Sequence, residues 1–287
     1  MRCLLLLVAP FAFGQNCAPT PPNPRQGDLI RLACGAGVAE ARMSGKTIRL
    51  FPAGEGRPGE LGLMPVAADA KPGLYRIDLL DSSGKVVHTV DVTVRDAHFP
   101  AQNVTMSQAL ADLEASPGEM DTVGAFTATV SDRRYWGDSF VAPVPGCVTS
   151  PFGVQRLRNG RPTGHYHTGL DQRTPLGHPV RAFAGGVVRL VRSYNIHGKV
   201  VGVDHGQGLV SLYLHLSRFA VKEGDVVKAG DVLGYAGSTG RSTAPHLHWN
   251  VEANGVPVNP TQWISVKPCP GPSKSQGRRP LTRRKPR

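Results

Sequence analysis

Residues 246–252 read His-Leu-His-Trp-Asn-Val-Glu, and this stretch decides the fold. Side chains two positions apart in a β-strand lie on the same face. His246, His248 and Asn250 would therefore form a polar face, whereas the intervening leucine, tryptophan and valine would face a hydrophobic interior. The pattern predicts a sheet that carries imidazoles on one side and a packed core on the other.

The surrounding sequence continues this pattern. Between Cys147 and about Ile264, short apolar runs with glycine at nearly every junction predict a compact, mostly antiparallel sheet domain, and no helical pattern is long enough for an α/β fold. One run, Leu209–Leu216, carries Tyr213 and His215 two positions apart, which predicts that these two side chains share a face with the imidazoles opposite the leucines.

A third element, His167-Thr-Gly-Leu-Asp171, also supplies an imidazole and a carboxylate. In an extended strand the two would lie about 13 Å apart. Zinc ligands sit only about 2 Å from the metal. The segment must therefore bend if both residues serve one ion, and Gly169 lies where it can.

These elements together contain the donor set of a catalytic zinc site. We assign His167, Asp171 and His248 as zinc ligands, with water in the fourth position. No His-Glu-x-x-His helix is present to supply a glutamate base, so His215 and His246 are the candidates for general base and for acid or oxyanion stabiliser. The sequence does not decide which does which, and His165, two residues before His167, is a rival ligand.

The N-terminal half has a different character. Short alternating runs separated by turn residues predict an immunoglobulin-like β-sandwich over residues 15–97, where no residue cluster has a chemical pattern. Residues 98–144 contain a helical pattern from Met106 to Ala115 that stops at Ser-Pro-Gly, and we interpret them as a linker with a short helix. The sheet domain follows as residues 145–266.

The chain begins with Met-Arg and an apolar run that ends near residue 14, which is typical of a signal peptide (residues 1–14) and too short for a membrane span of about 20 residues. Its removal would leave four cysteines in an oxidising compartment. Four cysteines allow three pairings. We favour Cys17 with Cys34 and Cys147 with Cys269, since each pair brackets a compact unit. The predicted location is the periplasm or the extracellular cell-wall space.

The net charge of +12 is concentrated at the C-terminus. Residues 267–287 hold eight lysines and arginines, several prolines and no acid, which predicts a disordered tail. The tail is either a solvated end or an element attracted to anionic wall polymer or a membrane surface. We expect no nucleic-acid partner for an exported protein, and nothing indicates an oligomeric state.

From about Pro145 to Trp263 the chain resembles the lysostaphin-like zinc metallopeptidases, which are peptidoglycan endopeptidases. The segments that carry the resemblance are Thr149–Gly153, His167–Asp171, Asp204–Gly208, Tyr213–Leu216, Val221–Asp225 and Gly237–Trp249. The resemblance implies an antiparallel β fold and one zinc ion. It also implies ligands at His167, Asp171 and His248, with non-ligand histidines at His215 and His246, which makes His165 the second choice.

The resemblance further implies that the substrate is the peptide part of peptidoglycan. Two alternatives stay open: a non-catalytic peptidoglycan-binding regulator of other wall hydrolases, and a zinc carboxypeptidase that removes terminal D-Ala. The basic residues Arg156, Arg158 and Arg161 could meet carboxylates of the stem peptide, although solvated charge is the simpler interpretation. Since non-catalytic family members typically lose one or more of the five histidine and aspartate residues, the complete set favours an active enzyme.

Overall fold

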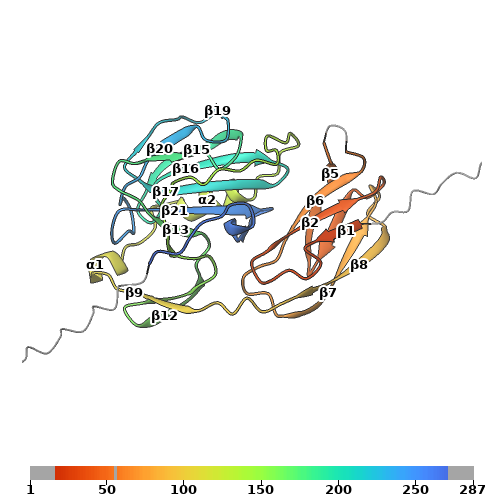
Figure 1. Ribbon diagram of the computed structural model, residues 1–287, viewed down its shortest axis with the longest axis horizontal. Helices are drawn as coiled ribbons and strands as arrows, with labels where there is room; N and C mark the ends of the chain where they lie inside the picture. The colour runs from red at the N-terminus through yellow and green to blue at the C-terminus, as the bar shows by residue number, and fades with distance from the viewer. Residues whose placement is uncertain (1–16, 55–56, 271–287) are drawn as a thin grey trace, which may run out of the picture.

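The computed structural model describes residues 17–54 and 57–270, which form two β-rich domains side by side (Figure 1). The predicted signal peptide and nearly all of the predicted basic tail lie outside the described residues. In the part of the chain that is described, no helix has the length and apolar character needed to cross a membrane. The prediction of a mostly β fold with antiparallel sheets is confirmed.

The first domain consists of two four-stranded antiparallel sheets packed face to face. Their strands, in spatial order, are β1 (Cys17–Thr20), β2 (Leu29–Cys34), β6 (Glu60–Pro65) and β5 (Phe51–Pro52) in one sheet, and β4 (Lys46–Arg49), β3 (Glu40–Met43), β7 (Gly73–Leu80) and β8 (Val86–Val94) in the other. Ile30 and Leu32 from β2 meet Ile77 and Leu79 from β7 in a fully buried core. This arrangement is a β-sandwich, and its immunoglobulin-like character stays a prediction.

The second domain is built on one large sheet. Its strands, in spatial order, are β10 (Val148–Ser150), β13 (Leu170–Arg173), β21 (His246–Ala253), β17 (Leu209–Leu216), β16 (Gly198–Gly206), β15 (Gly186–Tyr194) and β19 (Val226–Val227), with β22 (Val256–Val258) also paired to β21. Two smaller sheets flank it, β14 (Pro179–Arg181) with β20 (Val232–Tyr235) and β18 (Arg218–Phe219), and β12 (Arg161–Tyr166) with β11 (Gln155–Arg158) and β9 (Ala101–Val104). The two strands that flank β21 in this sheet, β13 and β17, carry further residues of the candidate site.

The two faces of the large sheet are buried differently. One face packs around the aromatic side chains of Phe183, Tyr213 and Trp249. On the other face, Phe126 of helix α2 (Glu119–Thr127) packs against a cluster that includes Leu214. The imidazole-bearing positions of β21 therefore lie on the face that is only partly covered.

Residues 98–144, expected to be a linker, pack onto the second domain instead of merely spanning the gap between domains (Figure 1). Strand β9 pairs in parallel with β11, with Ala101 opposite Gln155. The short helix α1 (Gln108–Ala111) follows, and Ser107 caps its N-terminus. The apolar residues of this segment were enough to signal a helix but not to show where it packs.

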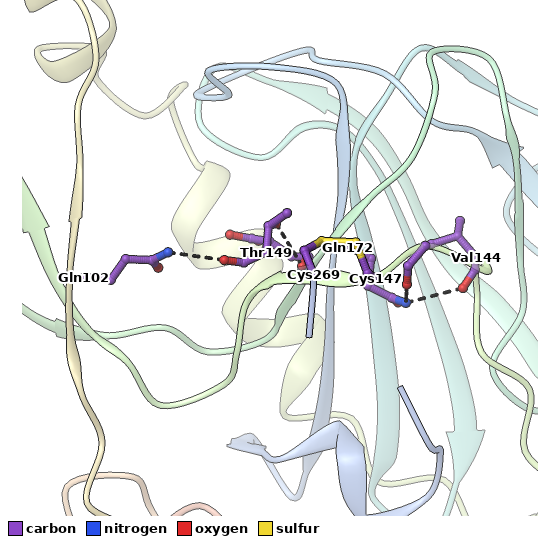
Figure 2. The surroundings of a disulfide bond; sticks show 8 residues. Gln102, Val144, Cys147, Thr149, Gln172 and Cys269 are labelled. Carbon is purple, nitrogen blue, oxygen red and sulfur yellow. Dashed lines mark hydrogen bonds between the residues drawn. A yellow bond between two sulfur atoms is a disulfide. The ribbon is translucent and has the colours of Figure 1, made fainter. Parts of the chain in front are cut away.

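Both predicted disulfides are present. Cys17–Cys34 joins β1 to β2, and Cys147–Cys269 closes a separation of 122 residues. Figure 2 shows the second bond beside Gln172, whose amide nitrogen donates to the carbonyl of Val144 at 3.3 Å. A bond that closes so long a loop contributes about 2–5 kcal/mol to stability. It ties the C-terminal segment around Pro268 to the start of β10, which pairs with β13, the strand that carries Asp171.

Candidate metal centre and active-site groove

Three donor atoms from two adjacent strands and a preceding bend converge at one point. Asp171 on β13 lies directly opposite His248 on β21 in the antiparallel register. The Asp171 Oδ1 atom is 2.7 Å from His248 Nδ1 and 3.1 Å from His167 Nε2. The two imidazole nitrogens are themselves 3.0 Å apart. The side chains are only 4–13% exposed.

The His167–Asp171 segment bends as its spacing required. Strand β12 ends at Tyr166 and β13 begins at Leu170, so His167 lies in the turn between them. Gly169 is needed there for close approach: a Cβ at this position would lie 2.3 Å from Asn250 Oδ1 and 2.4 Å from the carbonyl oxygen of Trp249. Any larger residue would push β13 away from β21 and separate the donors.

Hydrogen bonds on the outer nitrogens fix which atoms face the centre. His167 Nδ1 donates to the carbonyl of Pro151 at 2.8 Å, and His248 Nε2 donates to Asn250 Oδ1 at 2.5 Å. A neutral imidazole has one protonated nitrogen and one lone pair. His167 Nε2 and His248 Nδ1 therefore both present lone pairs toward the Asp171 carboxylate. Asn250 and Pro151 thus orient the two imidazoles.

The second carboxylate oxygen of Asp171, Oδ2, forms an ion pair with an arginine. Arg156 on β11 donates to Asp171 Oδ2 at 2.8 Å. Burial alone would raise the pKa of Asp171, but its close interactions with the His167 and His248 imidazoles outweigh burial and hold the pKa well below its usual range. The carboxyl group is therefore ionised at neutral pH, with Oδ1 facing the imidazoles and Oδ2 facing Arg156.

Three acceptor atoms that face one another this closely need a cation between them. The ligand atoms of His167, Asp171 and His248 all lie within 4.8 Å of one another. In a tetrahedral site with bonds of about 2.0 Å, ligand atoms lie about 3.3 Å apart. The observed separations of 2.7–3.1 Å are close to this value. The site therefore fits a small divalent metal with two nitrogen ligands, one oxygen ligand and an open fourth position.

His215 and His246 lie beside the three donors without joining them. Their ring centroids are 5.0 Å apart, and His246 Nε2 is 3.8 Å from Asp171 Oδ1. Each Nδ1 donates at 2.8 Å to a backbone carbonyl, that of Thr239 for His215 and that of Ala244 for His246. In a neutral ring held this way, Nε2 carries the lone pair. Burial, followed by the charges of His246 and His248, lowers the pKa of His215 to about 3, so this imidazole is neutral at pH 7.

The predicted face of Tyr213 is wrong. Tyr213 lies opposite Trp249 and is fully buried in the core, whereas Leu214 lines the groove together with His215. The alternation breaks because two residues of β17, Leu214 and His215, oppose Val200 alone on β16. His215 has a left-handed backbone (φ 58°) at this β-bulge. The bulge turns the imidazole toward the other histidines.

The rival ligand His165 does not join the donor cluster. It is exposed on β12 and lies at the rim of the groove. His205, another histidine of this domain, is fully buried: its Nδ1 donates to the carbonyl of Gly185, and its Nε2 is 2.8 Å from Ser211 Oγ. Burial lowers the pKa of His205 to about 4, so it is a neutral structural residue.

A groove of about 310 Å³ lies over the donor cluster. Its lining includes all five histidine and aspartate residues, Val104 at the end of β9, Met106 just after that strand, and Arg241 from the loop before β21. Within the described residues, none of the first 97 lines the groove. The sandwich domain therefore leaves this groove open. An open groove over a cluster that fits a metal ion, with two flanking imidazoles, is typical of a metallopeptidase.

The comparisons with known proteins agree with this class. The model of peptidase family M23 matches residues 165–260, a range that contains all five site residues. A crystal structure from Pseudomonas aeruginosa described as a peptidase M23 is 30% identical, with a TM-score of 0.64, and the match covers 85% of this chain and 95% of that one. The chain therefore belongs to peptidase family M23, and the predicted lysostaphin-like metallopeptidase family is confirmed.

Two curated relatives match the same domain. DD-carboxypeptidase/endopeptidase Mpg of Neisseria meningitidis is 46% identical over 113 residues, which are 39% of this chain and 26% of the relative. Peptidoglycan DD-endopeptidase ShyA of Vibrio cholerae is 38% identical over 112 residues, with the same coverages of 39% and 26%. The chain thus spans about a quarter of the length of these relatives.

Sequence reasoning missed two residues that orient the ligands. Asn250 was predicted to share the face of the histidines, but its bond to His248 Nε2 was not foreseen. Arg156 was considered only as a contact for substrate, whereas it binds Asp171 Oδ2. Its position could not be found from spacing, because β11 and β13 are not paired neighbours in any sheet.

Proposed function

We propose that the protein is a secreted zinc endopeptidase that hydrolyses peptide crosslinks or stem peptides of cell-wall peptidoglycan. The observation that supports the proposal best is the convergence of His167, Asp171 and His248 beside two further imidazoles in an open groove. The printed names of the Neisseria and Vibrio relatives support peptidoglycan as the substrate.

In this proposal His167 Nε2, Asp171 Oδ1 and His248 Nδ1 hold the ion. Zinc bound there would supply Lewis acidity and bring the pKa of water at its open position toward neutrality. Asn250 and Pro151 keep the two imidazoles in the tautomers that present lone pairs. Arg156 occupies the second carboxylate oxygen and so favours binding through Oδ1 alone.

His215 and His246 carry the protons. Because each Nδ1 is fixed on a backbone carbonyl, each Nε2 can accept a proton or a hydrogen bond in the groove. One imidazole accepts the proton of the attacking water, and the other, when protonated at Nε2, stabilises the oxyanion or donates that proton to the leaving amine. The left-handed backbone of His215 holds its ring close to His246.

The proposed location is extracytoplasmic. Two disulfides persist in oxidising compartments and are rare in the cytosol. The basic tail would add attraction to anionic wall polymer or to a membrane surface.

A second candidate activity is removal of terminal D-Ala by the same chemistry. The name of the Neisseria relative includes both carboxypeptidase and endopeptidase, which favours keeping this candidate. A non-catalytic wall-binding regulator is the contrasting possibility, and the complete set of five residues argues against it.

Digestion of defined muropeptides by the zinc-loaded full-length mature protein tests the proposal. Mass spectrometry of the products identifies the severed bond and separates endopeptidase from carboxypeptidase action. Loss of general acid–base catalysis costs about 10²–10⁴ in rate. We therefore expect His215→Ala and His246→Ala to lose activity by that order and to retain zinc, whereas Asp171→Ala loses zinc.

The surface residue His88 on β8 provides the matched control, since it lies outside the groove. His88→Ala should cleave like the unaltered protein. The proposal fails if the zinc-loaded protein releases no peptide from any of several peptidoglycan types, or if His215→Ala cleaves as fast as His88→Ala.

A further inference from the structure

The charged side chains of the groove are mostly positive. Among the described residues that line it, Arg156, Arg158 and Arg241 are the cationic ones and Asp171 is the acidic one. Arg156 is already bound to Asp171. Arg158 and Arg241 form no ion pair within residues 17–54 and 57–270. The groove therefore contains two arginines whose charge the described protein does not neutralise by direct contact.

Arg158 is held in place at the end of β11. Its backbone pairs with Val104 of β9 on one side and with Arg161 of β12 on the other. One guanidinium nitrogen donates to the carbonyl of Ala111 at 3.1 Å. A guanidinium has five N–H donors in a planar fork. Most of the donors of Arg158 thus stay available while its position is fixed.

Arg241 comes from a different part of the chain, the loop between β20 and β21. Its backbone nitrogen donates to the carbonyl of Ile196 at 3.1 Å. The preceding Gly240 has φ +72°, and a Cβ there would lie 2.4 Å from the backbone nitrogen of Gly198. The loop is thereby fixed against the turn between β15 and β16, and Arg241 projects from a defined position.

Both arginines line the same groove, and their like charges repel each other. Burial lowers the pKa of Arg241, and the positive charge of Arg158 lowers it further. Glu119 acts in the opposite direction. Its carboxylate is fully buried, however, and already accepts hydrogen bonds from the backbone nitrogens of Ser116, Ile196 and His197. An anion placed between the two arginines would relieve this repulsion.

We propose that Arg158 and Arg241 form a subsite that binds a free carboxylate of the substrate peptide. The assignment rests on the proposed function, since the peptide would occupy the same groove as the metal centre. Planar guanidinium groups match a carboxylate in geometry, and such charge-assisted bonds are about twice as strong as neutral ones. The preferred substrate is then an acidic peptide with an unmodified carboxylate near the cleaved amide, and its amidated counterpart is a poor substrate.

A binding experiment tests the subsite separately from catalysis. The full-length mature protein is treated with chelator and titrated with two peptides that differ in one group, a free carboxylate or the carboxamide on the diamino acid. Loss of a hydrogen bond to a charged group weakens binding about 10-fold or more. We expect the unaltered protein to bind the peptide with the free carboxylate more tightly by this factor. The preference should become smaller as the salt concentration rises.

Arg158→Gln and Arg241→Gln should each abolish the preference, and Arg241→Lys should retain part of it. Arg161 provides the matched control because it is exposed, lies opposite Arg158 in the hairpin and does not line the groove. Arg161→Gln should keep the full preference. If Arg241→Gln discriminates as well as Arg161→Gln does, the subsite is refuted.

Cleavage assays on the zinc-loaded protein separate the two proposals. Cleavage of both peptides at equal rates would refute the subsite and leave the endopeptidase function standing. Retained discrimination in binding, with cleavage of neither peptide, would support the subsite and refute the proposed function.

Discussion

Replacing Asn250 by alanine tests the geometry of the metal centre most directly. Asn250 Oδ1 accepts the Nε2 proton of His248 at 2.5 Å, which leaves Nδ1 as the lone pair that faces His167 and Asp171. Without this acceptor the proton can move to Nδ1, and the ring can rotate. The substitution therefore weakens metal binding without removing a ligand.

The size of the effect follows from the bond that is lost. A hydrogen bond of this kind contributes about 1 kcal/mol, which corresponds to roughly fivefold in affinity, and a protonated nitrogen left facing the ion costs more. Loss of an outer partner of a metal-bound histidine typically costs about 10–100-fold in metal affinity. We expect Asn250→Ala to fall in that range.

Competition between the protein and a chromophoric zinc chelator measures the affinity. Thr168→Val is the matched control, because it removes the partner of Asn250 Nδ2 at 3.2 Å and leaves Oδ1 in place. Thr168→Val should bind zinc nearly as well as the unaltered protein. The reasoning is refuted if Asn250→Ala and Thr168→Val have the same zinc affinity, provided that circular dichroism shows both to be folded.

Two further predictions concern the strands that carry the site. Burial raises the pKa of Glu252 to about 7 from its ordinary 4.5, so the folded state keeps a proton that the unfolded state releases, and stability falls as pH rises from about 4.5 through 7. This decrease amounts to at most about 3 kcal/mol. In Glu252→Gln, the free energy of unfolding measured with urea should no longer decrease over this pH range. An unchanged pH profile in the variant would contradict the raised pKa of Glu252. Gly169→Ala should lower the free energy of unfolding by about 1–3 kcal/mol through overpacking and should weaken zinc binding. Gly137→Ala, whose Cβ would meet nothing within 4 Å, is the control and should change neither quantity. Equal melting temperatures for the two variants would show that β13 adapts to the added methyl group.

The convergence of His167, Asp171 and His248 could be predicted because it depends on local spacing and composition. Two histidines two positions apart on one strand must share a face, and the distance between His167 and Asp171 required a bend at or near Gly169. The disulfide pairs followed from the same kind of argument, since each joins the ends of a compact unit. These features needed no knowledge of how distant strands are arranged.

The features that escaped prediction depend on pairing between strands. The β-bulge at His215 arises from the register of β17 against β16, and a strict two-residue period cannot reveal it. Arg156 reaches Asp171, and Arg241 lines the same groove as Arg158, only because loops and hairpins from separate parts of the chain meet over the sheet. Net charge likewise pointed to the tail and not to the arginines of the groove.

The pairing of β9 with β11 has a practical consequence for anyone who wishes to produce the enzyme in parts. A fragment that starts at residue 145, the boundary suggested by sequence pattern, would lack the strand opposite Gln155–Arg158 and the helix that covers Leu214. Its hairpin would expose an unpaired edge, which invites aggregation. A fragment that starts near residue 98 keeps these elements, although it forgoes the sandwich, and is the better starting point for crystallisation or directed evolution.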